Sequence, residues 1–151
     1  MISLVEELLN TKEKDIYIRE FLNMYPSLRN RDAYFYYKKC GIISILFHEF
    51  LKLRNLDSII IAGKELNTAY TNWMHVVIPE VKINIRNGKR FGHAVVLFND
   101  SIYDLSSLQF TNDLYSIYSL KEFEKRWKKI DYNMFKKYNK TDYENELAQI
   151  L

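Results

Sequence analysis

The spacing of hydrophobic residues changes along the chain and divides it into helical and extended parts. Apolar residues recur at helical spacing over 2–10 and again over 16–25, where the pattern ends before Pro26. After a polar and aromatic connector, the residues over 41–55 place one apolar stripe along a third helix. This stripe predicts a helix that packs against a sheet and begins at Cys40.

From residue 58 onward the pattern becomes typical of strands. Stretches rich in β-branched and aromatic residues predict strands over 58–63, 73–79, 81–85, 92–98 and 101–105. Asn87-Gly88 and Asn99-Asp100 are residue pairs that favour tight turns between antiparallel strands. From Ser119 to Leu151 helical spacing returns, with one apolar face and one basic face.

The order of helices, strands and helix predicts an α+β fold, with helices packed on a central antiparallel sheet. We expect the sheet to span about 58–106, between a helical N-terminal third and a helical C-terminal tail. The 151 residues suffice for one hydrophobic core, and no Pro/Ser-rich linker interrupts them, so we expect a single domain over 1–151.

Composition narrows the function classes without identifying one. The chain is 48% hydrophobic and carries 22 Lys and Arg against 19 Asp and Glu, an even balance that identifies no charged partner. The N-terminal residues include carboxylates and form neither a basic leader nor a long apolar run, so we expect a cytoplasmic protein without a membrane segment. No phosphate-binding glycine loop or metal-ligand spacing occurs, and we expect neither a cofactor nor a metal.

The single cysteine, Cys40, is the first candidate for chemistry. A thiolate forms more readily at a helix N-terminus, where the helix dipole presents partial positive charge. Lys38 and Lys39 precede the cysteine, and an ammonium group near the sulfur would favour the thiolate further. The alternative is that Cys40 is a small, inert core residue, because free cysteine is among the most buried residue types.

A nucleophilic cysteine needs a base, and imidazole is the usual one at neutral pH. His48 follows Cys40 by two helical turns, roughly 12 Å, which is too far for proton transfer. His75 lies in a predicted strand without an acid to orient it, and we keep it as a reserve base. His93 is the leading candidate because a carboxylate, Asp104, follows it in the predicted hairpin.

The parity of the hairpin places His93 and Asp104 on one face of the sheet. An even-length loop places Asp104 on the face of His93, opposite Val95 for a loop at 99–100, Leu97 for 100–101 or His93 itself for 98–99. An odd-length loop or a bulge would separate the two faces. In the first register His93 lies diagonally from Asp104. The diagonal separation of roughly 7 to 8 Å between backbones lets the carboxylate accept a hydrogen bond from the imidazole. The alternative is a surface hairpin whose histidine and aspartate are unrelated.

These residues resemble the papain-like superfamily in its transglutaminase-like branch. The resemblance covers about 37–110 and rests on Cys40-Gly41 at a helix start, Gly92-His93-Ala94-Val95-Val96 on a strand and Tyr103-Asp104-Leu105 on the next. Members of the branch present Cys, His and Asp in this chain order. The resemblance implies a papain-like core, with Cys40 as nucleophile, His93 as base and Asp104 as the orienting acid. It also implies a thioester intermediate that water or an amine resolves.

The chain departs from the papain pattern upstream of Cys40. Papain-type enzymes carry a glutamine there that helps to stabilise the oxyanion, and residues 33–39 contain none. Two donors aimed at the developing charge suffice for such a site. Our candidates are the backbone amide of Cys40 together with Tyr36, Tyr37 or Trp73, although packing against the sheet is the simpler role for the tyrosines.

We therefore expect a cysteine-dependent acyl-transfer enzyme, acting as a peptidase, deamidase or acyltransferase on a peptide, a protein or a small amide or thioester. The alternative is a catalytically inactive papain-like scaffold that serves as a protein-binding or immunity module. Nucleic-acid binding is not expected, because Glu122 and Glu124 dilute the charge of the basic tail residues Lys121, Lys125, Arg126, Lys128 and Lys129.

Overall fold

The computed structural model describes residues 15–29, 31, 33–36, 39–65, 92–107, 115–129 and 144–151. The predicted helix over 2–10, the predicted strands over 73–79 and 81–85 and the turn at Asn87-Gly88 lie outside these residues. The helices are α2 (Ile16–Met24), the 3-10 turn η1 (Pro26–Leu28), α3 (Ala33–Tyr36), α4 (Cys40–Leu53), α7 (Leu120–Arg126) and α8 (Glu144–Ile150). The strands are β1 (Ile59–Glu65), β2 (Gly92–Phe98), β3 (Ser101–Asp104), β4 (Ser116–Tyr118) and β5 (Trp127–Lys129).

The strands form one five-stranded sheet in the order β4-β3-β2-β1-β5. All four pairings are antiparallel, so the predicted α+β class and antiparallel sheet are confirmed. Sequence patterns locate β1, β2 and β3, but they miss the two edge strands β4 and β5, each of three residues. None of the helices among the described residues is long and apolar enough to cross a membrane.

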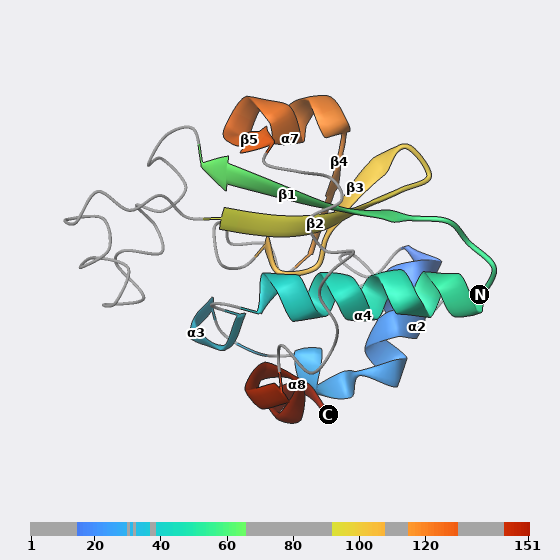
Figure 1. Ribbon diagram of the computed structural model, residues 1–151. Helices are drawn as coiled ribbons and strands as arrows, with labels where there is room; N and C mark the ends of the chain where they lie inside the picture. The colour runs from blue at the N-terminus through green and yellow to red at the C-terminus, as the bar shows by residue number, and fades with distance from the viewer. Residues whose placement is uncertain are drawn as a thin grey trace, which may run out of the picture.

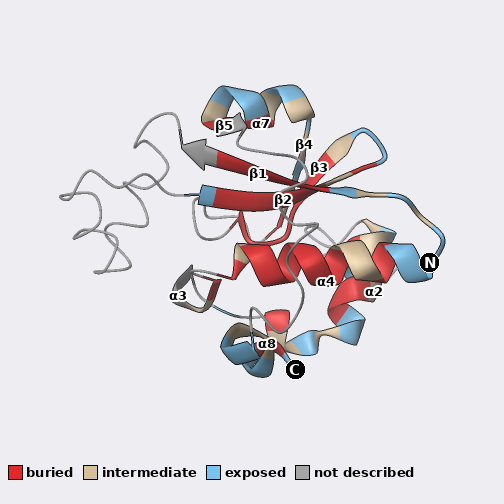
Figure 2. Cartoon of the chain, viewed as in Figure 1, coloured by how far each residue is buried: buried red, intermediate tan, exposed pale blue. Residues whose placement is uncertain are grey.

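Helices cover both faces of the sheet. Figure 1 shows α4 along one face of β1 and β2, with α7 on the opposite side. Because side chains alternate along a strand, Val96 and Phe98 of β2 face α4, whereas His93 and Val95 share the other face. Both faces are buried, as the red interior of Figure 2 shows.

Aromatic rings fill the layer between α4 and the sheet. Phe47 of α4 stacks on Tyr103 of β3, with ring centroids 5.5 Å apart, and meets Phe21 of α2 edge to face at 5.2 Å. Phe50 is 1% exposed and completes this group. The predicted apolar stripe of the third helix is thus the face on which the main core is built.

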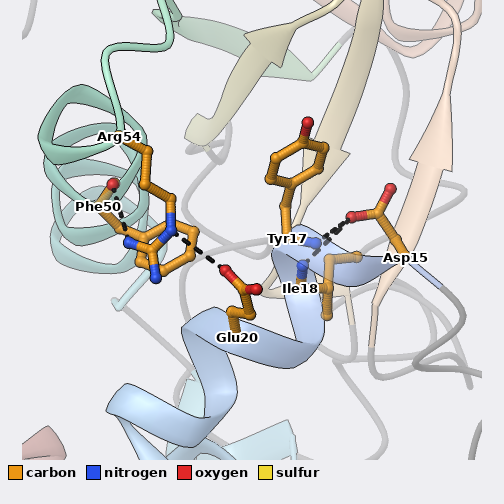
Figure 3. Close-up of polar contacts among 6 residues, drawn as sticks. All are labelled: Asp15, Tyr17, Ile18, Glu20, Phe50 and Arg54. Carbon is orange, nitrogen blue, oxygen red and sulfur yellow. Dashed lines mark hydrogen bonds and ion pairs between the residues drawn. The ribbon is translucent and has the colours of Figure 1, made fainter.

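Polar contacts cap the N-terminus of α2 and hold the helix beside α4, as Figure 3 shows. Asp15 caps the helix, because its Oδ1 accepts hydrogen bonds from the backbone amides of Tyr17 and Ile18. Glu20 pairs with Arg54 at 3.1 Å, and the guanidinium of Arg54 lies 3.7 Å from the ring centroid of Phe50. The second predicted helix is confirmed, with its end at Met24 rather than Tyr25.

The predicted helical tail from Ser119 is helical in α7 and α8, but the prediction is wrong for Trp127–Lys129, which form a strand. Helix α7 ends at Arg126, and Trp127 adopts an extended conformation that begins β5. Trp127 is 3% exposed and packs over the sheet, so tertiary burial decides its conformation. Segment 116–129 therefore crosses the sheet face from β4 at one edge, through α7, to β5 at the other. We call this segment the strap.

Close packing of the strap requires a glycine at position 63. A Cβ atom added at Gly63 would lie 2.5 Å from the Cβ of Trp127 and 2.9 Å from Cζ of Phe123. Because β5 is hydrogen-bonded to β1, the Trp127 backbone cannot shift freely. We expect Gly63→Ala to lower the free energy of unfolding by about 1 to 3 kcal/mol in a urea titration.

Gly92 supplies the matched control for this prediction. It occupies the neighbouring strand, and the nearest described atom to a Cβ added there would be the carbonyl oxygen of Gly63, at 3.7 Å. Gly92→Ala should therefore change the stability little. Equal losses for the two variants would contradict the close-packing explanation.

Candidate active site

Cys40 is the first residue of α4, as predicted, and follows Lys39, which occupies the N-cap position. The side chain of Lys39 makes no capping hydrogen bond to the amides of the first helical turn. Cys40 is partly exposed, whereas Gly41 and the residues after it are buried. The thiol thus lies between solvent and core at the positive end of a 14-residue helix.

The hairpin of β2 and β3 has the first of the registers that an even-length loop allows. Val96 pairs with Tyr103 and Phe98 with Ser101, so Asn99 and Asp100 form a two-residue loop. Both loop residues have positive φ, 54° and 63°, as the favoured hairpin turn with matching twist requires.

The predicted diagonal contact between His93 and Asp104 is present. Nε2 of His93 lies 2.7 Å from Oδ2 of Asp104, and the two side chains are 0% and 6% exposed. Since a carboxylate can only accept a hydrogen bond, Nε2 carries the proton. This leaves Nδ1 as the ring nitrogen that can exchange a proton with another group.

Three hydrogen bonds from described residues hold the carboxylate of Asp104. Besides His93, the hydroxyl of Tyr118 donates to Oδ2 at 3.0 Å, and the backbone amide of Ser106 donates to Oδ1 at 3.3 Å. The two donors other than histidine come from the strap and from the turn that follows β3. Asp104 itself is 4% exposed, so these contacts replace hydration that burial removes.

The electrostatics of His93 connect it to Cys40. Burial lowers the pKa of the imidazole, but the charge and hydrogen bond of Asp104, followed by the hydrogen bond and charge of Cys40, raise it to about 10. Figure 1 shows the start of α4 and the start of β2 at the same end of the molecule. His93 is therefore hydrogen-bonded to Asp104 and coupled electrostatically to Cys40.

The strap covers the histidine. The rings of Trp127 and His93 have centroids 5.1 Å apart and are tilted by 38°. Gly63, which pairs with His93 across β1 and β2, leaves room for that indole. The imidazole is thereby excluded from water, which strengthens its interactions with neighbouring charges.

Two other residues that the sequence analysis considered, His48 and Tyr36, form hydrogen bonds away from Cys40, His93 and Asp104. His48 was excluded as a base, and its Nδ1 is hydrogen-bonded to Ser58 Oγ at 2.6 Å. Tyr36 was an oxyanion candidate, and this expectation is corrected: its hydroxyl donates to the carbonyl of Leu28, and the residue is 0% exposed. Burial raises the pKa of Tyr36 far above its ordinary value. Tyr36 therefore has the packing role.

The remaining candidates lie partly beyond the described residues. Tyr37, Trp73, His75 and Lys38 are all outside them. Lys39 is buried, and its ammonium donates to the carbonyl of Phe35 and lies 4.4 Å from the centroid of that ring. The cation of Lys39 thus helps to join α3 to the start of α4.

Sequence reasoning missed Tyr118 and Trp127 as neighbours of the site. A three-residue edge strand carries too short an alternating pattern to stand out. Tyr118 is one of 12 tyrosines, and Trp127 fits a helical stripe as well as a strand. The one usable indication was the parity of the β2–β3 hairpin, because it determines the face of the sheet on which Asp104 lies.

Among the described residues no cluster of three or more His, Cys, Asp or Glu side chains is placed to hold a metal ion.

No protein-family model, curated protein or solved structure matches this chain.

The pairing of His93 predicts a specific dependence of stability on pH. Its folded pKa is raised from 6.5 to about 10, so the protonated imidazole stabilises the fold fully below pH 6.5. That contribution is lost as the pH rises toward 10. We expect the free energy of unfolding to fall between pH 6.5 and 10 by more in the wild type than in His93→Gln.

Urea titrations of both proteins across this range measure the difference. Groups such as tyrosine and lysine also titrate there, but they are common to both proteins and cancel. Parallel curves for the wild type and the variant would contradict a protonated, stabilising His93.

Proposed function

We propose that this protein is a cysteine-dependent acyl-transfer enzyme with a papain-like core of the transglutaminase-like kind. The observation that carries the proposal is the buried His93–Asp104 hydrogen bond, on adjacent strands, together with the electrostatic coupling of His93 to Cys40 at a helix start. Its substrate is a peptide, protein or small molecule with an amide or thioester carbonyl.

Cys40, His93 and Asp104 each have a chemical role that their environment supports. Of the three residues, Cys40 is the one that is partly exposed. A nucleophile needs this exposure because it must contact the substrate. The protonated imidazole beside the sulfur favours the thiolate, and the carboxylate of Asp104 stabilises that imidazolium. Asp104 also fixes the ring so that Nδ1 is the nitrogen left for proton exchange.

Acylation starts when the thiolate sulfur attacks the carbonyl carbon. A carbon–sulfur bond forms and the carbonyl electron pair moves to oxygen. When this intermediate collapses, the bond to the leaving group breaks, and the leaving group takes a proton from His93. The backbone amides of the first turn of α4 are suitable donors to the transient oxyanion, since helix geometry leaves them without intrahelical partners.

Deacylation reverses these roles. Water or an amine attacks the thioester carbon while His93 accepts its proton. The carbon–sulfur bond then breaks, the acyl group leaves as an acid or an amide, and the thiolate and imidazolium are restored.

Acylation of the intact protein by p-nitrophenyl acetate tests the proposal. We expect release of p-nitrophenolate and addition of one acetyl group at Cys40, detected by mass spectrometry, at least about 10-fold faster than for N-acetylcysteine at pH 6.5. Cys40→Ser should lack the adduct, and hydroxylamine should remove it from the wild type.

A rate equal to or below that of the free thiol would refute the enzyme proposal. In that case, capture of a binding partner that persists in Cys40→Ser would favour the inactive-scaffold alternative.

A further inference from the structure

Asp104 lies between two diagonal neighbours on one face of the sheet. The register of β2 and β3 continues to Val95 opposite Asp104, with His93 two residues away. On the other side, Asp104 pairs with Ser116 of β4, and Tyr118 is two residues away in the opposite diagonal position. The carboxylate therefore receives hydrogen bonds from both sides within its own sheet.

Tyr118 and His93 donate to the same oxygen. Oδ2 accepts hydrogen bonds from the imidazole at 2.7 Å and from the phenol at 3.0 Å, whereas the one donor to Oδ1 among the described residues is the amide of Ser106, at a longer 3.3 Å. If the phenol were removed, the remaining short hydrogen bond to the carboxylate would be the one from His93. Asp104 would then be held in place by the same residue that it has to orient.

The strap holds the phenol in place. Tyr118 is half-buried, and the guanidinium of Arg126 in α7 lies 5.7 Å from the centroid of its ring. Ser119 alone separates β4 from α7, and it caps the helix because its hydroxyl accepts from the amide of Glu122. Tyr118 is therefore fixed on both its backbone and its ring.

We propose that Tyr118 is a positioning residue that acts on His93 through Asp104, making the catalytic group a four-residue chain of Cys40, His93, Asp104 and Tyr118. This inference rests on the proposed function. The phenol holds Oδ2 in the direction of His93 Nε2, so that the imidazole stays aligned while its Nδ1 exchanges a proton with Cys40. Tyr118 touches neither the sulfur nor a substrate in this role.

The test compares Tyr118→Phe with the wild type. Phenylalanine keeps the ring and removes only the hydroxyl. We expect acylation of Cys40 by p-nitrophenyl acetate to slow about 10-fold, the factor expected for loss of one hydrogen bond to a charged group. The pKa of His93, measured by NMR through its ring protons, should fall toward its ordinary value, because a carboxylate free to rotate stabilises the imidazolium less.

Tyr103→Phe is the matched control. Tyr103 directly precedes Asp104 in β3, and its hydroxyl donates to Asp15 Oδ2 at 2.7 Å, away from the catalytic group. This variant loses a tyrosine–aspartate hydrogen bond of the same kind, and we expect it to change stability without changing the acylation rate or the pKa of His93.

The outcomes separate the two proposals. If the wild type does not outpace N-acetylcysteine, the enzyme proposal fails, and the NMR titration alone still tests the link between Tyr118 and His93. If the wild type reacts as expected but Tyr118→Phe matches it in rate and in the pKa of His93, the positioning role is refuted. A raised pKa of His93 in Tyr118→Phe, or equal effects in Tyr103→Phe, would refute it as well.

Discussion

Replacing His93 with glutamine is expected to slow acylation of Cys40 by about 10²- to 10⁴-fold, the usual contribution of a general acid–base group. A glutamine amide can still donate to Asp104, so the polar contact in the buried interior is retained. It cannot take up or release a proton, and it carries no charge that favours a thiolate. The initial rate of p-nitrophenolate release at pH 6.5 measures the effect.

His48→Gln is the matched control, because His48 follows Cys40 on the same helix and is hydrogen-bonded to Ser58. Its replacement should leave the acylation rate within about twofold of the wild type. A similar loss in both variants would show that the rate reports a general disturbance of α4, and the role of His93 as base would then be abandoned.

Replacing Asp104 with alanine should cause the largest loss of stability. It removes the partner of a fully buried imidazole and also leaves the phenol of Tyr118 without the acceptor found in the structure. Removing one member of a buried charged pair costs about 3 to 5 kcal/mol. We expect about 3 kcal/mol at pH 6, near the lower limit, because the imidazole can release its proton. Urea denaturation followed by circular dichroism measures it.

Asp57→Ala controls for the loss of an aspartate as such. Asp57 is exposed in the connection before β1, and its replacement should change the free energy of unfolding by less than about 0.5 kcal/mol. A charged His93–Asp104 pair stabilises the fold at pH 6 more than at pH 10, so Asp104→Ala should lower the free energy of unfolding more at pH 6. Equal losses at the two pH values would contradict a charged pair.

The sequence allowed prediction of those parts of the site that local rules determine. Two consecutive turn-forming residues at Asn99 and Asp100 set the loop length, loop length sets the register, and the register sets the shared face of His93 and Asp104. The start of α4 at Cys40 follows in the same way from the apolar stripe that the helix buries. These predictions depend on residues close together in the chain.

The missed parts depend on contacts between distant residues. Trp127 continues a helical pattern, yet it adopts an extended conformation because β1 offers an open edge and Gly63 offers space for the indole. The sequence alone does not show the partner of the Tyr36 hydroxyl. Its orientation toward Leu28 is decided by how η1 and α3 pack. No spacing rule contains this information, since it arises only when the elements meet.

The placement of β5 has a consequence for how the protein folds. β5 pairs with β1 although β2, β3, β4 and α7 all lie between them in the chain. Pairings between distant segments form late, because closing a long loop loses entropy before the new contacts exist. His93 therefore acquires its indole cover in one of the last steps of folding, and a nascent chain that has not yet reached Trp127 holds its histidine–aspartate pair on an unsheltered surface.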